Sequence, residues 1–200
     1  MSLPPCRRRA AIAGLFAGPW FAVALLVFAA RVPEYRHALH PPALLGATGM
    51  PDALAWNLLG FVVPGLLAAV ALQALHGALR AARANFVARI GATVLLLSAL
   101  AFVAQGLLPL RLGQALDAGP ARMHVVAWML WWLAALAGFA LLAAGLRRQR
   151  LLAGGAVLAA IAMAIALHAI FVPLPGGVRE LLARVAWFAW IACAGLARQP

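Results

Sequence analysis

The sequence predicts an all-α, polytopic membrane protein: one domain over residues 1–200 in which six transmembrane helices form a single bundle. Two observations support this prediction. Hydrophobic residues make up 66% of the chain and the mean hydropathy is +0.99, which is more apolar surface than a soluble domain of this size can bury. The apolar residues also fall into six long runs, separated by short segments rich in arginine or proline, as expected where the solvent is a bilayer.

The first apolar run, residues 10–30, follows a leader that contains three consecutive arginines. A run of this length can cross a hydrocarbon core of ~30 Å as a helix. A cleaved signal peptide begins in a similar way, but this run is long for one and further apolar runs follow, so we expect a transmembrane helix. Gly14 and Gly18 form a GxxxG pattern that would allow another helix to approach closely.

Residues 31–52 are expected to form a long polar loop, because Pro41, Pro42 and Pro51 prevent a continuous helix. Pro51 and Asp52 suit the first turn of the next helix, where a missing N–H is tolerated and an acid meets the positive end of the dipole. Arginine-rich turns, a polar loop and a proline–glycine breaker separate the remaining runs. The later spans are expected at about residues 53–79, 86–108, 123–146, 151–172 and 178–197.

Six spans place both termini on one side of the membrane. The side shared by the leader, the turns at 80–89 and 147–150 and the C-terminus holds ten arginines and no acid, whereas the other side holds six arginines and all four acids. The positive-inside rule therefore predicts cytoplasmic termini. The net charge of +12 comes from arginines clustered between apolar runs, which is typical of topology signals and argues against nucleic-acid binding.

Short motifs are spread over nearly the whole chain: Pro-x-Tyr after the first span, Leu-Gly in the loop, and an Asn followed by Phe-x-x-x-Gly in the second span. A proline ends the third span, a histidine opens the fourth, and an arginine precedes a tryptophan in the sixth. The residues are Pro33, Tyr35, Leu45, Gly46, Asn57, Phe61, Gly65, Pro109, His124, Arg184 and Trp187.

This set of motifs resembles the domain-of-unknown-function 998 family, six-span membrane proteins of bacteria and archaea. The resemblance implies the six-helix fold and localisation in a bacterial plasma (inner) membrane, but it implies no established activity. The family pattern has a serine before Leu-Gly, where this chain has Ala43 and Leu44. A role for that hydroxyl therefore does not carry over to this chain.

Polar side chains are concentrated in the outer part of the predicted spans. Asn57, Gln105, His124 and His168 each lie near the outer end of a span, below the acids of the outer loops. Polar groups at membrane depth usually face the bundle interior or a wet cavity, so we expect a polar pocket that opens outward. Arg179 and Arg184, at the start of the last span, are long enough to snorkel to the headgroups. The candidate ligand-binding residues are Asn57, Gln105, Trp128, Trp131 and Arg184.

These polar residues could serve only to form hydrogen bonds between helices. If they have a function, three kinds stay open. The leading one is binding or sensing of a lipid-like molecule, with its head near the histidines and its tail along the tryptophans. The second is an intramembrane enzyme acting on a lipid or lipid-linked headgroup, with acid/base groups or metal ligands at His124, His168, Asp52 and Glu34. The third is a transporter or a subunit of a membrane complex or homo-oligomer, for which an exposed small-residue face such as Gly14 and Gly18 would be expected.

No cofactor is predicted, and a metal ion or a b-type haem is kept as an alternative. Imidazole is a common metal ligand, and the candidate ligands are His37, His40, His124 and His168. Glu34, His37 and His40 are spaced i, i+3, i+6, which on a helix separates the first and last by about 120° and about 9 Å, so a helical loop would not bring all three together. A haem would need His124 and His168 on facing helices. The expected partners are membrane lipids.

Overall fold

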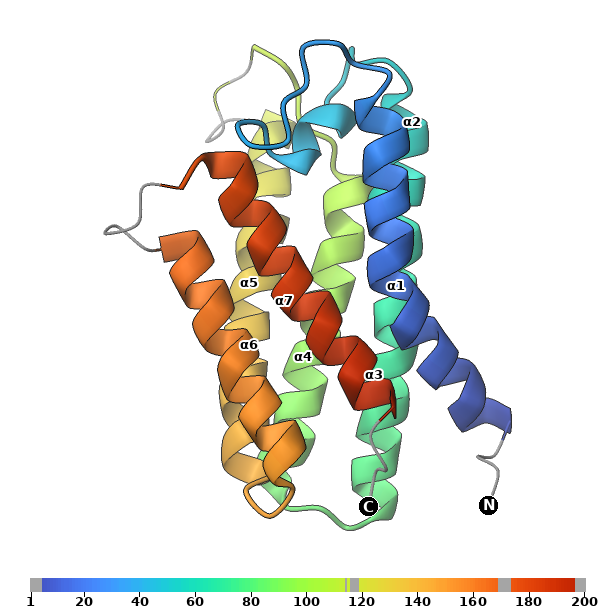
Figure 1. Cartoon of the computed structure of the whole chain (residues 1–200), viewed down its shortest axis with the longest axis vertical. Helices are drawn as coiled ribbons and strands as arrows, with labels where there is room; N and C mark the ends of the chain where they lie inside the picture. Colours follow the sequence, from blue (N-terminus) through green and yellow to red (C-terminus); the bar gives the residue numbers. More distant parts are fainter. Residues whose placement is uncertain (1–4, 114, 116–118, 169–173, 197–200) are drawn as a thin grey trace.

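The computed structural model describes residues 5–113, 115, 119–168 and 174–196 of the chain. It is a bundle of long helices (Figure 1), and the described residues form no β-strand beyond an isolated bridge between Thr48 and Arg111. The elements are α1 (Pro5–Ala29), the 3₁₀ helix η1 (Pro42–Gly46), α2 (Ala53–Trp56), the π-helical segment η2 (Asn57–Val62), α3 (Val63–Ala81), α4 (Phe86–Leu107), α5 (Gly119–Gly145), α6 (Arg150–His168) and α7 (Gly176–Leu196).

The predicted all-α fold is confirmed, and the long helices match the predicted spans to within five residues where the structure describes them. The predicted ends of the fifth and sixth spans, at residues 169–172 and 197, lie outside the described residues. Five segments are long and apolar enough to cross a membrane: Arg8–Ala29, Ala53–Ala81, Phe86–Leu107, Ala121–Gly145 and Arg150–Leu167. The outer surface of the bundle carries many exposed leucine, valine and isoleucine side chains. This composition is typical of a multi-pass membrane protein, whose outer surface faces lipid.

The helix α7 corresponds to the sixth predicted span, but it is not among the five segments that are long and apolar enough to cross a membrane. Its first turns contain Arg179, Glu180 and Arg184, and such charges are costly where a helix faces lipid. The segment still packs as a full member of the bundle, against α1 and α6. Its charged side chains therefore need partners within the protein.

Figure 1 shows that the bundle has two distinct ends. The first residues of α1 and the last residues of α7 lie at one end, with the α3–α4 and α5–α6 connections; we call this the terminal end. The long loop between α1 and α2 and the segment that follows α4 lie at the opposite end, which we call the loop end.

The helices α4 and α5 form the most extensive helix pair. Glycines allow this close approach: a Cβ at Gly138 would lie 2.9 Å from the backbone nitrogen of Leu95, and one at Gly91 would lie 2.8 Å from that of Leu142. Such small-residue contacts are the usual way in which membrane helices pack tightly.

Gly14 and Gly18 are also used inside the chain. A Cβ at Gly14 would lie 3.2 Å from the Cβ of Ala71 in α3, and one at Gly18 would lie 3.0 Å from the Cβ of Phe188 in α7. The GxxxG pattern therefore brings α1 close to α3 and α7. It does not provide the exposed face that a subunit interface would require.

Candidate functional site

The long loop at the loop end packs on the start of α7. The Val178 backbone N–H donates to the Ala38 carbonyl at 3.2 Å. A Cβ at Gly177 would overlap the His37 carbonyl and lie 2.7 Å from that of His40, so the close approach of this loop requires a glycine. The loop therefore covers the helix turns that carry Glu180 and Arg184.

Tyr35 anchors this loop from inside. Its ring is buried, its hydroxyl donates to the His40 carbonyl at 3.1 Å, and its ring contacts the rings of His37 and His40. Burial raises the pKa of Tyr35 to about 12; the Arg184 guanidinium acts in the opposite direction and the Glu180 carboxylate adds to the increase. Tyr35 belongs to the loop that packs on the start of α7, the helix that carries Glu180 and Arg184.

The second predicted span begins with an irregular turn. Residues Asn57–Val62 are π-helical, a conformation that often marks functional sites. Pro64 follows without an N–H to donate, and the Leu59 carbonyl accepts a bond from Trp20 Nε1 of α1 at 2.9 Å. Within the turn, Asn57 and Phe61 are both buried, and Asn57 Nδ2 donates to the Gly46 carbonyl. The turn thus directs both side chains inward, beneath the loop.

Arg184 lies in the interior of the bundle, with 1% of its side chain exposed. Its Nη1 donates to Glu180 Oε2 at 2.6 Å, one helical turn earlier. The guanidinium carbon lies 5.1 Å from the centre of the Trp131 ring, 5.9 Å from that of Phe61 and 6.0 Å from that of Phe102, within the range of cation–π contacts. The sequence suggested that Arg184 snorkels to the headgroups, and the structure shows that this prediction is wrong because the side chain points into the bundle.

Arg179 is also held by the protein and does not snorkel. Its Nε donates to the Ala166 carbonyl at 3.0 Å, and its Nη2 donates to the Leu167 carbonyl. Both carbonyls belong to the last turn of α6, where a cation interacts favourably with the free carbonyls and the helix dipole. Arg179 therefore joins the end of α6 to the start of α7.

One edge of the Arg184 guanidinium has no partner. Its Nε and Nη2 are buried without a hydrogen bond in the described structure. These two groups form the side-on edge of an arginine, which presents two parallel N–H donors to a pair of oxygen atoms. Glu180 occupies only the Nη1 side. The free edge is therefore a ready bidentate donor in the protein interior.

Gln105, on the last turn of α4, is another buried polar side chain in this region. It is 0% exposed, and neither Oε1 nor Nε2 has a hydrogen-bond partner among the described residues. It lies one turn from Phe102, which contacts Arg184. Buried amide groups are normally paired, because an unpaired one costs about 1–3 kcal/mol. Two unsatisfied polar side chains therefore share the same interior region.

His124, near the start of α5, lies beside them. Its Nδ1 is 2.8 Å from the Leu108 carbonyl and 3.1 Å from that of Gln105. Carbonyls only accept, so Nδ1 carries the proton and Nε2 is the acceptor of the neutral ring. The Phe61 ring contacts the His124 ring at 6.4 Å, which joins this histidine to the surroundings of Arg184. We call the set Tyr35, Gln105, His124, Glu180 and Arg184 the Arg184 cluster.

An aromatic layer lies next to the Arg184 cluster, toward the middle of the bundle. Phe102 stacks on Trp187 at 5.3 Å, and Trp131 meets Trp187 edge to face at 6.0 Å. Further on, Trp187 Nε1 donates to Ser98 Oγ at 3.1 Å. Ring contacts join the members of this layer, which are Phe21, Trp56, Phe61, Phe102, Trp131, Trp187 and Phe188.

Four of the predicted ligand-binding residues are buried at or beside the Arg184 cluster: Asn57, Gln105, Trp131 and Arg184. Trp128 is half-buried, and its ring contacts that of Trp132. Among the candidate catalytic residues, Glu34 is exposed, and Asp52 pairs with Arg31 at 2.7 Å with side chains 43% and 56% exposed. Among the described residues, neither acid forms a hydrogen bond or an ion pair with His124, whose Nδ1 bonds to backbone carbonyls.

The candidate metal ligands do not come together in the described part of the chain, where no group of three His, Cys, Asp or Glu side chains could hold a metal ion. His37 and His40 pack on Tyr35 instead, and His40 Nδ1 accepts from the Arg36 backbone N–H. The side chain of His168 lies outside the described residues, so the structure does not bear on the His124–His168 haem alternative.

Sequence reasoning missed the partners that surround Arg184. Glu180 was expected only as one of the charged residues above the polar pocket, although its spacing of four residues before Arg184 on a helix is a recognisable ion-pair signal. Phe61 was noted only as a motif residue, and Phe102 was not singled out. An apolar ring in an apolar span carries no local sign of a cation–π contact, so these two contacts required the three-dimensional arrangement.

Comparison of this chain with protein-family models, with curated proteins and with solved structures found no match. The resemblance to the domain-of-unknown-function 998 family therefore stays a prediction from short motifs.

Proposed function

We propose that this protein binds the polar head of a lipid-like molecule at the Arg184 cluster, from the loop end of a six-span bundle. The loop end then faces away from the cytoplasm and the arginine-rich terminal end faces it, in keeping with the positive-inside rule, in a bacterial plasma membrane. The observation that carries the proposal is the fully buried Arg184 with a free bidentate edge, near an unpartnered Gln105.

The chemistry of the cluster defines the head that would fit. Glu180 already balances the charge of Arg184, so the site calls for acceptor oxygens on the ligand more than for a net negative charge. The Arg184 edge offers two parallel donors, and Gln105 offers one donor group and one acceptor. A carboxylate, phosphate or ester head supplies matching oxygens. The aromatic layer supplies apolar contact for the first part of a tail.

The aromatic layer favours binding over transport. A transporter needs a polar route to both faces, and the Arg184 cluster is bordered by packed aromatic rings toward the terminal end. Ser98 and Trp187, which lie farther along, bond to each other. The packed rings thus leave no polar route from the Arg184 cluster toward the terminal end among the described residues.

The enzyme alternative rests on His124. Its fixed tautomer leaves Nε2 as an acceptor, which is the form that a general base requires. The acids chosen for it from the sequence are less suitable, because Asp52 is engaged with Arg31 at the surface and Glu34 is exposed. Binding is the simpler interpretation of the same cluster.

The proposal is tested by measuring which lipids the detergent-purified protein retains in native mass spectrometry. The probes are oleate, a phosphatidic acid and a monoacylglycerol, which differ in head charge and oxygen number. The decisive variant is Arg184→Gln/Glu180→Gln, which removes the buried pair without changing net charge. We expect its retention to fall by about 10-fold or more, as for loss of a charge-assisted bidentate contact.

The matched control is Arg31→Gln/Asp52→Asn, which removes the exposed ion pair at the same end. This variant should retain lipid as the natural sequence does. Equal retention by both double variants, or no retention of any probe by the natural protein, would overturn the proposal. Hydrolysis of a retained probe that is lost in His124→Ala would instead favour the enzyme alternative.

A further inference from the structure

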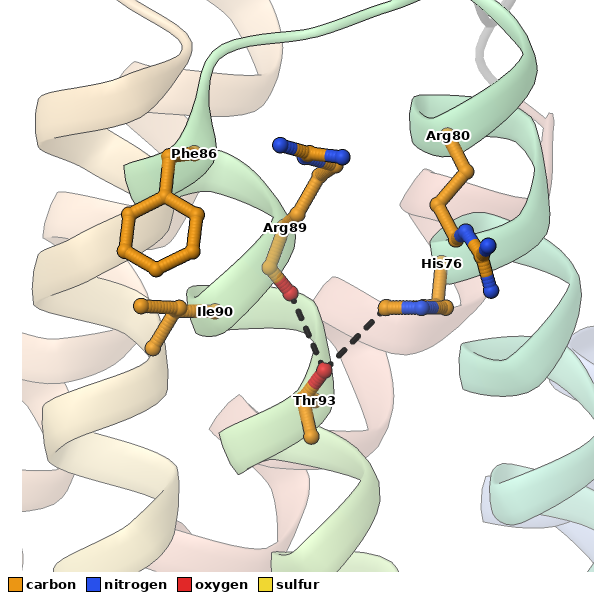
Figure 2. Close-up of a pocket in the computed structure, with 6 residues that line it drawn as sticks. All are labelled: His76, Arg80, Phe86, Arg89, Ile90 and Thr93. Atoms are coloured by element: carbon orange, nitrogen blue, oxygen red, sulfur yellow. Dashed lines mark hydrogen bonds between the residues drawn. The ribbon is translucent and has the colours of Figure 1, made fainter.

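A cavity of about 300 Å³ lies between α3 and α4 at the terminal end of the bundle. The Arg184 cluster lies toward the opposite, loop end. Figure 2 shows its lining, with two residues from α3 and four from α4: His76, Arg80, Phe86, Arg89, Ile90 and Thr93. Two arginines and a histidine thus meet at one opening, with two apolar side chains beside them.

The two arginines of this cavity carry uncompensated charge. The ion pairs found among the described residues are Arg31–Asp52 and Arg184–Glu180, both toward the loop end. Neither Arg80 nor Arg89 therefore has a carboxylate partner in the part of the chain that the structure covers. Two cations that line one cavity without a carboxylate partner favour an anion there.

The Arg89 side chain is held in place by Phe86 and keeps a free donor for an anion. Its guanidinium carbon lies 5.9 Å from the centre of the Phe86 ring, and its Nε is buried without a hydrogen-bond partner in the described structure. Arg80 projects from the facing helix and is exposed. Figure 2 shows the two side chains on either side of the gap between α3 and α4. An anion in this gap can therefore be contacted from both helices.

His76 and Thr93 form the floor of the cavity. The Thr93 hydroxyl donates to the Arg89 carbonyl at 3.1 Å, so it accepts from His76 Nδ1, which lies 3.2 Å away. The histidine therefore has its Nδ1 committed to Thr93, and Nε2 is the ring nitrogen left for a ligand. In the protonated ring, Nε2 is a further donor.

We propose that this cavity binds a phosphate group, held by Arg80 and Arg89 with His76 beneath it. A phosphate has several oxygens in a tetrahedral arrangement and can accept hydrogen bonds from two helices at once, whereas a carboxylate offers one plane. The group belongs either to the headgroup of an anionic lipid or to a free phosphate. Basic pockets between membrane helices bind anionic lipid headgroups, and the exposed Phe86 and Ile90 offer contact for an acyl chain.

The test compares retention of phosphatidylglycerol and phosphatidylcholine by the full-length protein in native mass spectrometry. The cavity variant is Arg80→Gln/Arg89→Gln. The matched control is Arg147→Gln/Arg148→Gln, which removes the same charge from two exposed arginines at the same end. We expect phosphatidylglycerol binding to weaken about 30-fold in the cavity variant, the effect of losing two arginine contacts near a membrane surface, and to change little in the control.

A second arm titrates lipid-free protein in detergent with inorganic phosphate by calorimetry. Heat of binding that is lost in the cavity variant identifies free phosphate as a ligand, whereas binding of phosphatidylglycerol alone identifies the lipid headgroup. Equal weakening in the cavity and control variants would mean a diffuse surface charge and would overturn the proposal. Absence of binding in both arms would overturn it too.

Folding of the variants is checked by thermal unfolding followed by tryptophan fluorescence. Arg80→Gln alone changes an exposed side chain and provides a milder variant, which should lose part of the affinity. Arg89→Lys keeps the charge but not the planar fork, and it should bind more weakly than the natural protein and more tightly than the double variant. This site is independent of the Arg184 cluster, so either proposal can fail without the other.

Discussion

Asn57 donates a hydrogen bond of 2.9 Å from its side-chain Nδ2 to the carbonyl of Gly46, and this bond joins the outer loop to the π-helical turn. The contact leaves no room for a side chain at residue 46, because a Cβ there would overlap Asn57 Oδ1. We expect Gly46→Ala to destabilise the protein by about 1–3 kcal/mol, as overpacking does, measured by thermal unfolding. Asn57→Ala should remove the overlap with the amide and leave only the close contact with the Trp56 ring, whose Cδ1 would lie 2.9 Å from the added Cβ. The double variant should therefore be more stable than the sum of the single effects. Additive effects would show that the overlap is not the cause.

Gln105 gives a prediction in which stability and binding change in opposite directions. Gln105→Leu removes two buried polar atoms without partners and keeps a similar volume. Since an unpaired buried polar group costs about 1–3 kcal/mol, the variant should unfold at a higher temperature. It should also retain less lipid in the native mass spectrometry test. A loss of stability would indicate that the amide has partners in the unliganded protein.

Tyr35 reports directly on the packing of the loop, because it is the one tyrosine in the sequence. Burial raises its pKa from the ordinary value of 10.0 to about 12. The folded protein thus holds the phenol proton more tightly than the unfolded chain. Its contribution to stability is fully present below pH 10 and is lost as the pH rises through about 12.

The tyrosinate ultraviolet absorbance measures this effect. It should appear near pH 12 in the folded protein and near pH 10 in the unfolded chain. Tyr35→Phe abolishes the signal and should flatten the alkaline decline in stability. Titration of the folded protein near pH 10 would show that the loop leaves Tyr35 open to water.

Gly138 and Gly154 form a matched pair of helical glycines. A Cβ at Gly138 would lie 2.9 Å from the Leu95 backbone nitrogen, whereas one at Gly154 meets nothing within 4 Å. Gly138→Ala should therefore destabilise the protein by about 1–3 kcal/mol. Gly154→Ala should stabilise it by up to about 1 kcal/mol, because alanine favours a helix over glycine. Similar effects of the two substitutions on thermal unfolding would argue against the close α4–α5 contact.

The long helices could be predicted because each one is a continuous apolar run bounded by arginine or proline. That signal depends on composition alone, so it is the same however the helix is turned about its own axis. It does not say which way a side chain points, and Arg184 shows the consequence: its position near the predicted membrane boundary suggested snorkelling, whereas the structure turns it inward to Glu180, Phe61, Phe102 and Trp131.

Only part of the candidate site could be predicted, because the sequence gives the depth of a residue along its span but not the direction of its side chain. Gln105 and His124 could be assigned to one depth from their distance to the span ends, and the Gln105 carbonyl does accept from His124. Asp52 was chosen because it is near this level in sequence. The backbone at Asp52 is left-handed, with a φ of 54°, and its carboxylate pairs with Arg31 at the surface. Hydropathy carries no information about such a turn, nor about the π-helical segment at residues 57–62.

The charges at the start of α7 also bear on how the chain is made. In the proposed six-span topology, α7 carries no charge after Arg184. An arginine at the centre of an isolated membrane helix costs about 2.5–3.5 kcal/mol on insertion, which is an upper bound for one nearer the end of its span, such as Arg184. Trp131, Phe61 and Phe102, which surround Arg184 in the finished bundle, are all synthesised before it. The final helix is therefore expected to enter the bilayer together with the helices that receive it, so that insertion of the last span and folding of the bundle become one event.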